Sequence, residues 1–200
     1  MVWVFGDSFS ADFNDSSNLC WSQSYIDMKG YIPKSFGKLL SSKLNCGYVN
    51  KSIGGTDNDT IYETICDNVP SINENDVVII GWTSMNRFRF PTNVNKWRTI
   101  LSSHIDMTLT NVSESTFQEI IINRSSPVYI DELKKRISFL NWILQNCVVI
   151  HWSPFKTQIN EIKQFPNIET IMDETNELMK EYHYSENGHN QLFHHFIDLI

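Results

Sequence analysis

The sequence predicts an α/β protein in which a parallel sheet is covered by helices on both faces. Short apolar runs rich in β-branched residues alternate with stretches that have helical periodicity. Each apolar run is followed by polar or small residues, which is typical of strands that end at a loop. With 200 residues, of which 41% are hydrophobic, the chain can bury one substantial core. We therefore expect one domain over residues 1–200.

Five apolar runs are long enough and β-rich enough to form the strands of this sheet. They are Val2–Phe5, Gly47–Asn50, Val77–Ile80, Val148–Trp152 and Ile168–Met172.

Apolar residues spaced three or four apart predict the helices between these strands. The predicted faces are Phe36, Leu39, Leu40 and Leu44; Ile61, Ile65 and Val69, behind the capping residues Asp57, Asn58 and Asp59; Leu133, Ile137, Leu140 and Leu144; and a closing helix with Leu192, Phe193, Phe196, Ile197 and Ile200. Residues 87–126 are polar and aperiodic, so we expect an irregular excursion above the sheet there.

Charge and cysteine spacing exclude several classes of partner. Sixteen basic and twenty-three acidic residues give a net charge of −7, without a basic cluster that could follow a phosphate backbone. Nucleic acid is therefore not an expected partner. The four cysteines lack the close pairs of a zinc site, so we expect buried free thiols and no metal. These cysteines are Cys20, Cys46, Cys66 and Cys147.

No segment of the sequence predicts a membrane location. The apolar run at Val2–Phe5 is too short for a signal-peptide core and has no basic leader. No later run approaches the roughly 20 apolar residues of a membrane-spanning helix. We expect a soluble protein that is cytoplasmic or virion-associated. The oligomeric state is left open.

Polar residues follow the predicted strands where a doubly wound sheet places its ligand crevice. Gly6–Ser8 follows the first strand, Lys51–Thr56 the second and Gly81–Arg87 the third. Ser185–His189 stands at the start of the closing helix.

These residues include the three types needed for nucleophilic catalysis. A serine hydroxyl becomes a nucleophile when an imidazole takes its proton, and a carboxylate orients that imidazole. Ser8, His189 and Glu186 supply these groups, with Glu186 three residues before His189. The backbone N–H groups of Ser8 and Gly55 are the natural donors to a developing oxyanion, because a glycine lets a substrate approach closely.

Four blocks of the sequence resemble the SGNH, or GDSL-type, hydrolase family. Gly6-Asp7-Ser8-Phe9-Ser10 is similar to the first block, and Val49–Thr56 resembles the second, where a glycine donates to the oxyanion. Val77–Gly81 resembles the strand and glycine of the third block. Glu186–His189 resembles the last block, in which an acid precedes the catalytic histidine by three residues. The blocks occur in the family's order along the whole chain.

This resemblance implies a three-layer α/β/α flavodoxin-like fold with five parallel strands in the order 2-1-3-4-5. It also implies hydrolysis of an acyl or acetyl ester without a metal or organic cofactor. Two positions depart from the family pattern. Glu186 stands where the family usually has aspartate, and Thr83 stands where the family has the asparagine that gives a third oxyanion donor. The alignment with Gly81 favours the Thr83 hydroxyl as that donor, Asn86 further along the loop is the alternative, and the third donor could also be absent.

Aromatic residues near the strand ends suggest a carbohydrate ester as the substrate, because flat indole rings pack well on sugar rings. Trp82 and Trp152 are the substrate-binding candidates, together with Arg87, and Trp21 and Trp97 lie in similar loops. Of the other histidines, His151 is expected to be hydrogen-bonded within its strand. The remaining four, His104, His183, His194 and His195, are expected to be solvated. We expect Asp7 to form structural hydrogen bonds in its loop.

Two functions follow from these patterns. The first is a serine esterase that acts through an acyl-enzyme on a small-molecule or carbohydrate ester. The second is a module of the same fold that binds a glycan or a protein and turns over substrate weakly or not at all. The altered third block motivates the second function.

Overall fold

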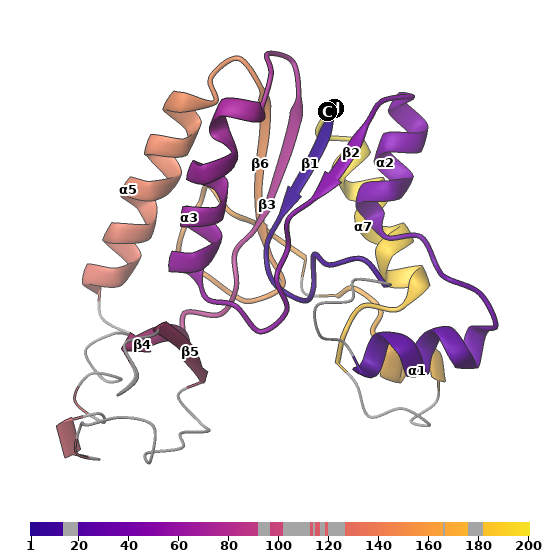
Figure 1. Cartoon of the computed structure of the whole chain (residues 1–200), viewed down its shortest axis with the longest axis horizontal. Coiled ribbons are helices and arrows are strands. Elements are labelled where there is room, and N and C mark those ends of the chain that lie inside the picture. The colour runs from indigo at the N-terminus through magenta and orange to yellow at the C-terminus, as the bar shows by residue number, and fades with distance from the viewer. Residues whose placement is uncertain are drawn as a thin grey trace.

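The computed structural model describes residues 1–13, 20–91, 97–101, 113, 115–116, 119, 127–165, 167–175 and 182–200. A five-stranded parallel sheet forms its centre, in the order β2-β1-β3-β6-β7 (Figure 1). The strands are β1 (Val2–Phe5), β2 (Tyr48–Asn50), β3 (Val77–Gly81), β6 (Val148–Ser153) and β7 (Lys163–Gln164).

Four of the five predicted strands are confirmed, but the fifth prediction was wrong. Residues 168–172 contain an isolated bridge from Thr170 to Tyr184 and the first turn of α6 (Ile171–Thr175). The fifth strand is β7, which pairs with Trp152 and Ser153. Because both residues of β7 are exposed and polar, no apolar run in the sequence marks it.

Helices cover both faces of the sheet, which gives three layers (Figure 1). On one face lie α3 (Asn58–Asn68) and α5 (Pro127–Ile143), and on the other lie α2 (Phe36–Leu44) and α7 (Glu186–Ile197). Side chains of a strand alternate between the two faces. Trp3 and Phe5 therefore pack in the core beneath α3 and α5, while Val2 and Val4 pack beneath α2 and α7.

Local capping explains where two of these helices begin. Asp57 accepts a hydrogen bond from the Thr60 N–H at 2.9 Å, and Ser185 accepts one from the Gly188 N–H at 2.9 Å. The sequence analysis also did not predict α1 (Cys20–Lys29) or the short 3-10 helix η1 (Val69–Ser71).

A two-stranded hairpin stands where the sequence predicted only irregular structure. It consists of β4 (Arg87–Pro91) and β5 (Trp97–Leu101), which pair antiparallel near the amino ends of α3 and α5 (Figure 1). Arg89 forms an ion pair with Glu63 of α3, and the Thr99 hydroxyl donates to Asp57 at 2.5 Å. Most of residues 102–126 lie outside the described residues.

The hairpin also changes how the strand order is counted. β4 and β5 lie between β3 and β6 in the chain but belong to a separate sheet. The order along the main sheet is therefore 2-1-3-6-7, which differs from the expected 2-1-3-4-5.

Three cysteines are free thiols in the structure and are half-buried rather than fully buried: Cys46, Cys66 and Cys147. The side chain of Cys20 lies outside the described residues. In the described part of the chain, no helix is both long and apolar enough to cross a bilayer.

Candidate functional site

Ser8 lies in a tight turn at the carboxyl end of β1, one of the central strands. The turn is closed by two hydrogen bonds to Asp7, from the Ser10 N–H to its carbonyl and from the Phe9 N–H to its carboxylate, both at 3.0 Å. Ser8 is 5% exposed. Its hydroxyl has no hydrogen-bond partner among the described residues, so no neighbouring acceptor holds it in place.

Two glycines allow this turn to form against the end of β3. A Cβ at Gly6 would lie 2.4 Å from the Ser10 Oγ, and a Cβ at Gly81 would lie 2.3 Å from the same atom. The Ser10 hydroxyl therefore occupies the space beside both glycines. This packing sets the position of the turn relative to the loop that follows β3.

Asp7 connects the turn of Ser8 to that loop. Its carboxylate accepts hydrogen bonds from the Thr83 hydroxyl at 2.6 Å and from the Arg87 Nη1 at 3.0 Å. Burial raises the pKa of Asp7, while the hydrogen bond from Thr83 and the charge of Arg87 act in the opposite sense. The structural role expected for Asp7 is confirmed by these contacts.

The two proposed third oxyanion donors differ in what they already contact. The Thr83 hydroxyl donates to Asp7, and the backbone N–H of Thr83 donates to the Asn58 side chain at 2.8 Å. Asn86 is exposed, and its side chain makes no hydrogen bond within the part of the chain described. Of the two, Asn86 has the uncommitted donor.

Gly55 lies between β2 and α3 in a left-handed conformation, with φ of 73°. No atom lies within 4 Å of the position that a Cβ would take there. There is therefore open space beside its backbone.

The side chain of His189 lies on the buried face of α7 and does not reach the protein surface. It is 1% exposed and is surrounded by the rings of Phe13, Phe36 and Tyr184. Its Nδ1 accepts a hydrogen bond from the Phe36 N–H at 3.3 Å. Burial lowers the pKa of His189 to about 4, so the ring is neutral and carries its proton on Nε2. A base that takes a proton through Nε2 needs the opposite tautomer.

Glu186 points away from His189 and toward α1. Its carboxylate accepts a hydrogen bond from the Tyr31 hydroxyl at 2.5 Å and lies 3.4 Å from the Lys29 ammonium. No hydrogen bond joins any two of Ser8, His189 and Glu186 among the described residues. The structure therefore does not assemble these three residues as a triad.

His183, which was expected to be solvated, lies beside the turn of Ser8. It is half-buried, and its ring stacks on Phe9 with 5.3 Å between ring centres. Its carbonyl accepts a hydrogen bond from the Ile171 N–H at 2.7 Å, which holds this part of the backbone. Burial and the charge of Arg87 lower the pKa of His183 to about 4. The sequence feature that could have indicated this placement is the position of His183, three residues before the first residue of the closing helix.

The two tryptophans proposed to bind substrate do not reach the site surface, so that prediction was wrong. Trp82 and Trp152 are 1% and 0% exposed, because each fills one of the two cores. The Trp82 indole donates to His151 Nδ1 at 3.1 Å, which confirms that His151 is a hydrogen-bonded strand residue.

Of the remaining histidines and tryptophans named in the sequence analysis, some are exposed and the others lie outside the described residues. His194 and His195 are exposed on α7, as expected. The side chains of Trp21 and Trp97 lie outside the described residues, and so does His104.

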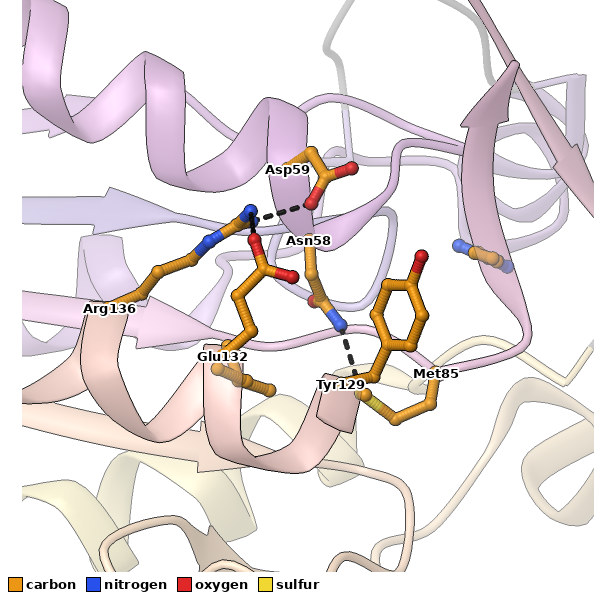
Figure 2. Close-up of a pocket in the computed structure, with 8 residues that line it drawn as sticks. Asn58, Asp59, Met85, Tyr129, Glu132 and Arg136 are labelled. Atoms are coloured by element: carbon orange, nitrogen blue, oxygen red, sulfur yellow. Dashed lines mark hydrogen bonds and ion pairs between the residues drawn. The ribbon is translucent and has the colours of Figure 1, made fainter. Parts of the chain in front are cut away.

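A pocket adjoins this site between α3, α5 and the loop after β3 (Figure 2). Arg87, the third substrate-binding candidate, lines this pocket and also contacts Asp7. The full lining is Asn58, Asp59, Met85, Arg87, Tyr129, Glu132, Leu133 and Arg136.

Comparisons of the chain with protein-family models and with curated proteins found no match.

Proposed function

We propose that this chain is a serine ester hydrolase of the SGNH type, with a flavodoxin-like fold and Ser8 as the nucleophile. The observation that carries the proposal is the position of Ser8. Its hydroxyl stands at the carboxyl end of a central strand with no competing partner among the described residues. The four sequence blocks that resemble the family support the same residue.

In this proposal the base is His183 rather than His189. His183 stacks on the residue that follows Ser8, whereas the Nδ1 of His189 is occupied by a backbone N–H. Glu186 is engaged with α1, so a different acid would orient the imidazole. Glu181 is the acidic residue closest to His183 in the sequence, and it lies outside the described residues.

The chemistry follows the two steps of an acyl-enzyme mechanism. Ser8 Oγ attacks the ester carbonyl while His183 takes its proton, and His183 then returns the proton to the leaving alcohol. Water hydrolyses the acyl-enzyme with His183 again as base. The backbone N–H groups of Ser8 and Gly55 and the side chain of Asn86 would stabilise the oxyanion. The substrate class is a small acyl ester, such as an acetyl ester.

One observation favours the alternative, a binding module with weak or no turnover. The Thr83 hydroxyl at the third-donor position is committed to Asp7. Loss of one oxyanion donor costs on the order of 10² to 10³ in turnover. If Asn86 does not replace this donor, ester hydrolysis would be slow.

Labelling with a fluorophosphonate distinguishes the two functions, because only an activated serine reacts. We expect the wild type to be labelled and Ser8→Ala to be unlabelled. Hydrolysis of p-nitrophenyl acetate should fall by about 10³-fold or more in Ser8→Ala. Ser71→Ala, which removes an exposed hydroxyl from η1, should behave as wild type.

Equal hydrolysis rates for the wild type and Ser8→Ala would refute the nucleophile. Absence of labelling in the wild type would favour the binding module.

A further inference from the structure

One edge of the main sheet is only partly covered by a neighbouring strand. β7 is the outermost strand on this side, and it pairs with Trp152 and Ser153 alone. The first part of β6, residues 148–151, therefore has β3 on one side and no strand of the described residues on the other. A sheet edge of this kind presents unpaired backbone groups, which are a template for another strand.

The hydrogen bonds of β6 show which of its backbone groups point outward at this edge. The Val148 N–H donates to the Asp76 carbonyl at 3.0 Å, on the side of β3. Because backbone groups alternate in direction along a strand, those of Val149 and His151 point to the other side. The N–H groups of Val149 and His151 have no acceptor among the described residues.

A groove lies along the outward side of β6, and we call it the edge groove. Its volume is about 270 Å³, compared with roughly 30 Å³ for one water molecule. Residues 148–151 form its floor, with Asn141 of α5 on one flank and Leu199 on the other. Glu161 and Lys163 stand at its end. The edge groove therefore has room for a segment of polypeptide beside β6.

We propose that a second copy of this chain fills the edge groove, with the two β6 strands paired antiparallel about a twofold axis at Val149. In this pairing Val149 exchanges both of its backbone hydrogen bonds with Val149 of the second copy. The His151 N–H donates to the Cys147 carbonyl of the second copy, and symmetry repeats this bond. The Cys147 N–H is not needed, because it already donates to the Leu144 carbonyl at 2.8 Å.

Charged residues at the two ends of β6 favour a second copy in this direction. Lys163 stands beside Trp152 at the carboxyl end of β6. At the amino end, the Asn146 side chain donates to Glu74 at 3.0 Å. An axis at Val149 sets Trp152 opposite Asn146 of the second copy. Lys163 of each copy then comes close to Glu74 of the other, and neither side chain has an ion pair among the described residues of a single chain.

Apolar side chains beside the axis favour the same partner. Leu199 lines the edge groove and is 42% exposed, and Val148 and Val149 are half-buried. Since these side chains lie next to the proposed axis, the second copy removes them from water. A twofold interface is closed, so the assembly ends at two copies.

Sedimentation equilibrium measures the association, and we expect the wild type to form a reversible dimer. Lys163→Glu and Glu74→Lys should each raise the dissociation constant by about 10-fold, because each turns attractive pairs into repulsive ones. The double variant with both changes should return the constant to within about threefold of wild type. Lys43→Glu, the same charge change on α2, should stay within about twofold of wild type.

Hydrogen exchange tests the strand pairing without relying on the charges. The amide protons of Val149 and His151 should be protected in the dimer and lose this protection on dilution. The Ile150 amide, which faces β3, should stay protected at both concentrations. Val149→Pro removes a paired donor where the N–H faces outward, so it should prevent the dimer while circular dichroism shows a folded chain.

Three outcomes would overturn the proposal. The first is a wild-type chain that stays monomeric at every attainable concentration. The second is a dimer in which the charge reversals have no effect and the exchange of the Val149 amide does not depend on concentration. The third is a double variant of Lys163 and Glu74 that associates as weakly as the single variants, which would exclude this register of the two strands.

Discussion

Replacement of His183 by alanine is expected to lower kcat/KM for p-nitrophenyl acetate by about 10³-fold, a typical contribution of a general base. His189→Asn is expected to keep activity within about 10-fold of wild type. The reason is packing, because His183 stacks on Phe9, the residue that follows Ser8, while His189 is enclosed among aromatic rings. Asparagine at position 189 retains an acceptor for the Phe36 N–H. Steady-state kinetics on folded variants, checked by circular dichroism, gives the comparison.

The effect of Arg87 on the pH dependence offers a further check on the base, because Arg87 lowers the pKa of His183 and is not among the groups that shift the pKa of His189. His183 must be neutral to accept a proton, and its pKa is lowered to about 4 by burial and by Arg87. Activity should therefore persist well below pH 6.5 and fall as the pH drops through about 4. Burial is the larger cause of this lowered pKa and the charge of Arg87 the smaller one, so in Arg87→Gln the acid limb should move part of the way to higher pH. If His189→Asn abolishes activity and His183→Ala does not, the base is His189 as the sequence suggested.

Acid conditions are also expected to lower the free energy of unfolding. Burial lowers the pKa of His189 to about 4, below its ordinary value of 6.5. Between pH 6.5 and pH 4 the His189 side chain therefore binds more protons in the unfolded chain than in the folded chain. For this reason the free energy of unfolding is highest above pH 6.5 and decreases as the pH falls toward 4. For His189 this loss is about 3 kcal/mol. Circular dichroism over the same pH range separates unfolding from titration of the base.

Gly188→Ala is expected to destabilise the fold by about 3 kcal/mol or more. A Cβ at this position would lie 2.1 Å from the carbonyl oxygen of Glu169, a backbone atom that cannot rotate away. Alanine within a helix normally gains about 1 kcal/mol over glycine, so the direction of the change is diagnostic. Urea denaturation measures the free energy of unfolding.

Gly47→Ala is the matched control for this variant, because its Cβ would meet only the Met1 side chain at 3.4 Å or more. It should change the free energy of unfolding by less than about 1 kcal/mol. A Gly188→Ala protein as stable as wild type would contradict the close packing of α7 on residue 169.

The strands that are buried on both faces could be predicted from the sequence, because such strands appear as continuous apolar runs. β1 and β3 are of this kind, with runs such as Val77–Ile80, and β6 is buried from Ile150 onward. β7 could not be predicted, since it consists of two exposed residues that pair with β6 at the edge of the sheet. The hairpin β4–β5 was missed although Arg87–Phe90 alternates basic and aromatic residues with the period of a strand, because Trp97–Leu101 does not show the same alternation.

The nucleophile could be proposed from sequence, whereas the base could not. Ser8 follows an apolar strand directly, so its place at the carboxyl edge of the sheet follows from the fold alone. His183 and His189 lie six residues apart around the start of one helix. His189 packs on Phe36 and His183 packs on Phe9, and a single sequence does not contain the information that separates these two environments.

The contact of Ser10 with two glycines constrains how this chain can change over time. Its Oγ lies where any side chain at Gly6 or Gly81 would have to go. A larger residue at Gly81 would therefore require position 10 to lose its hydroxyl first, whereas a Cβ at Gly6 would still lie 2.8 Å from the Ser10 Cβ and 2.9 Å from the Gly81 carbonyl oxygen. Positions 10 and 81, on two separate segments of the chain, are therefore expected to change together, and position 6 is expected to remain a glycine.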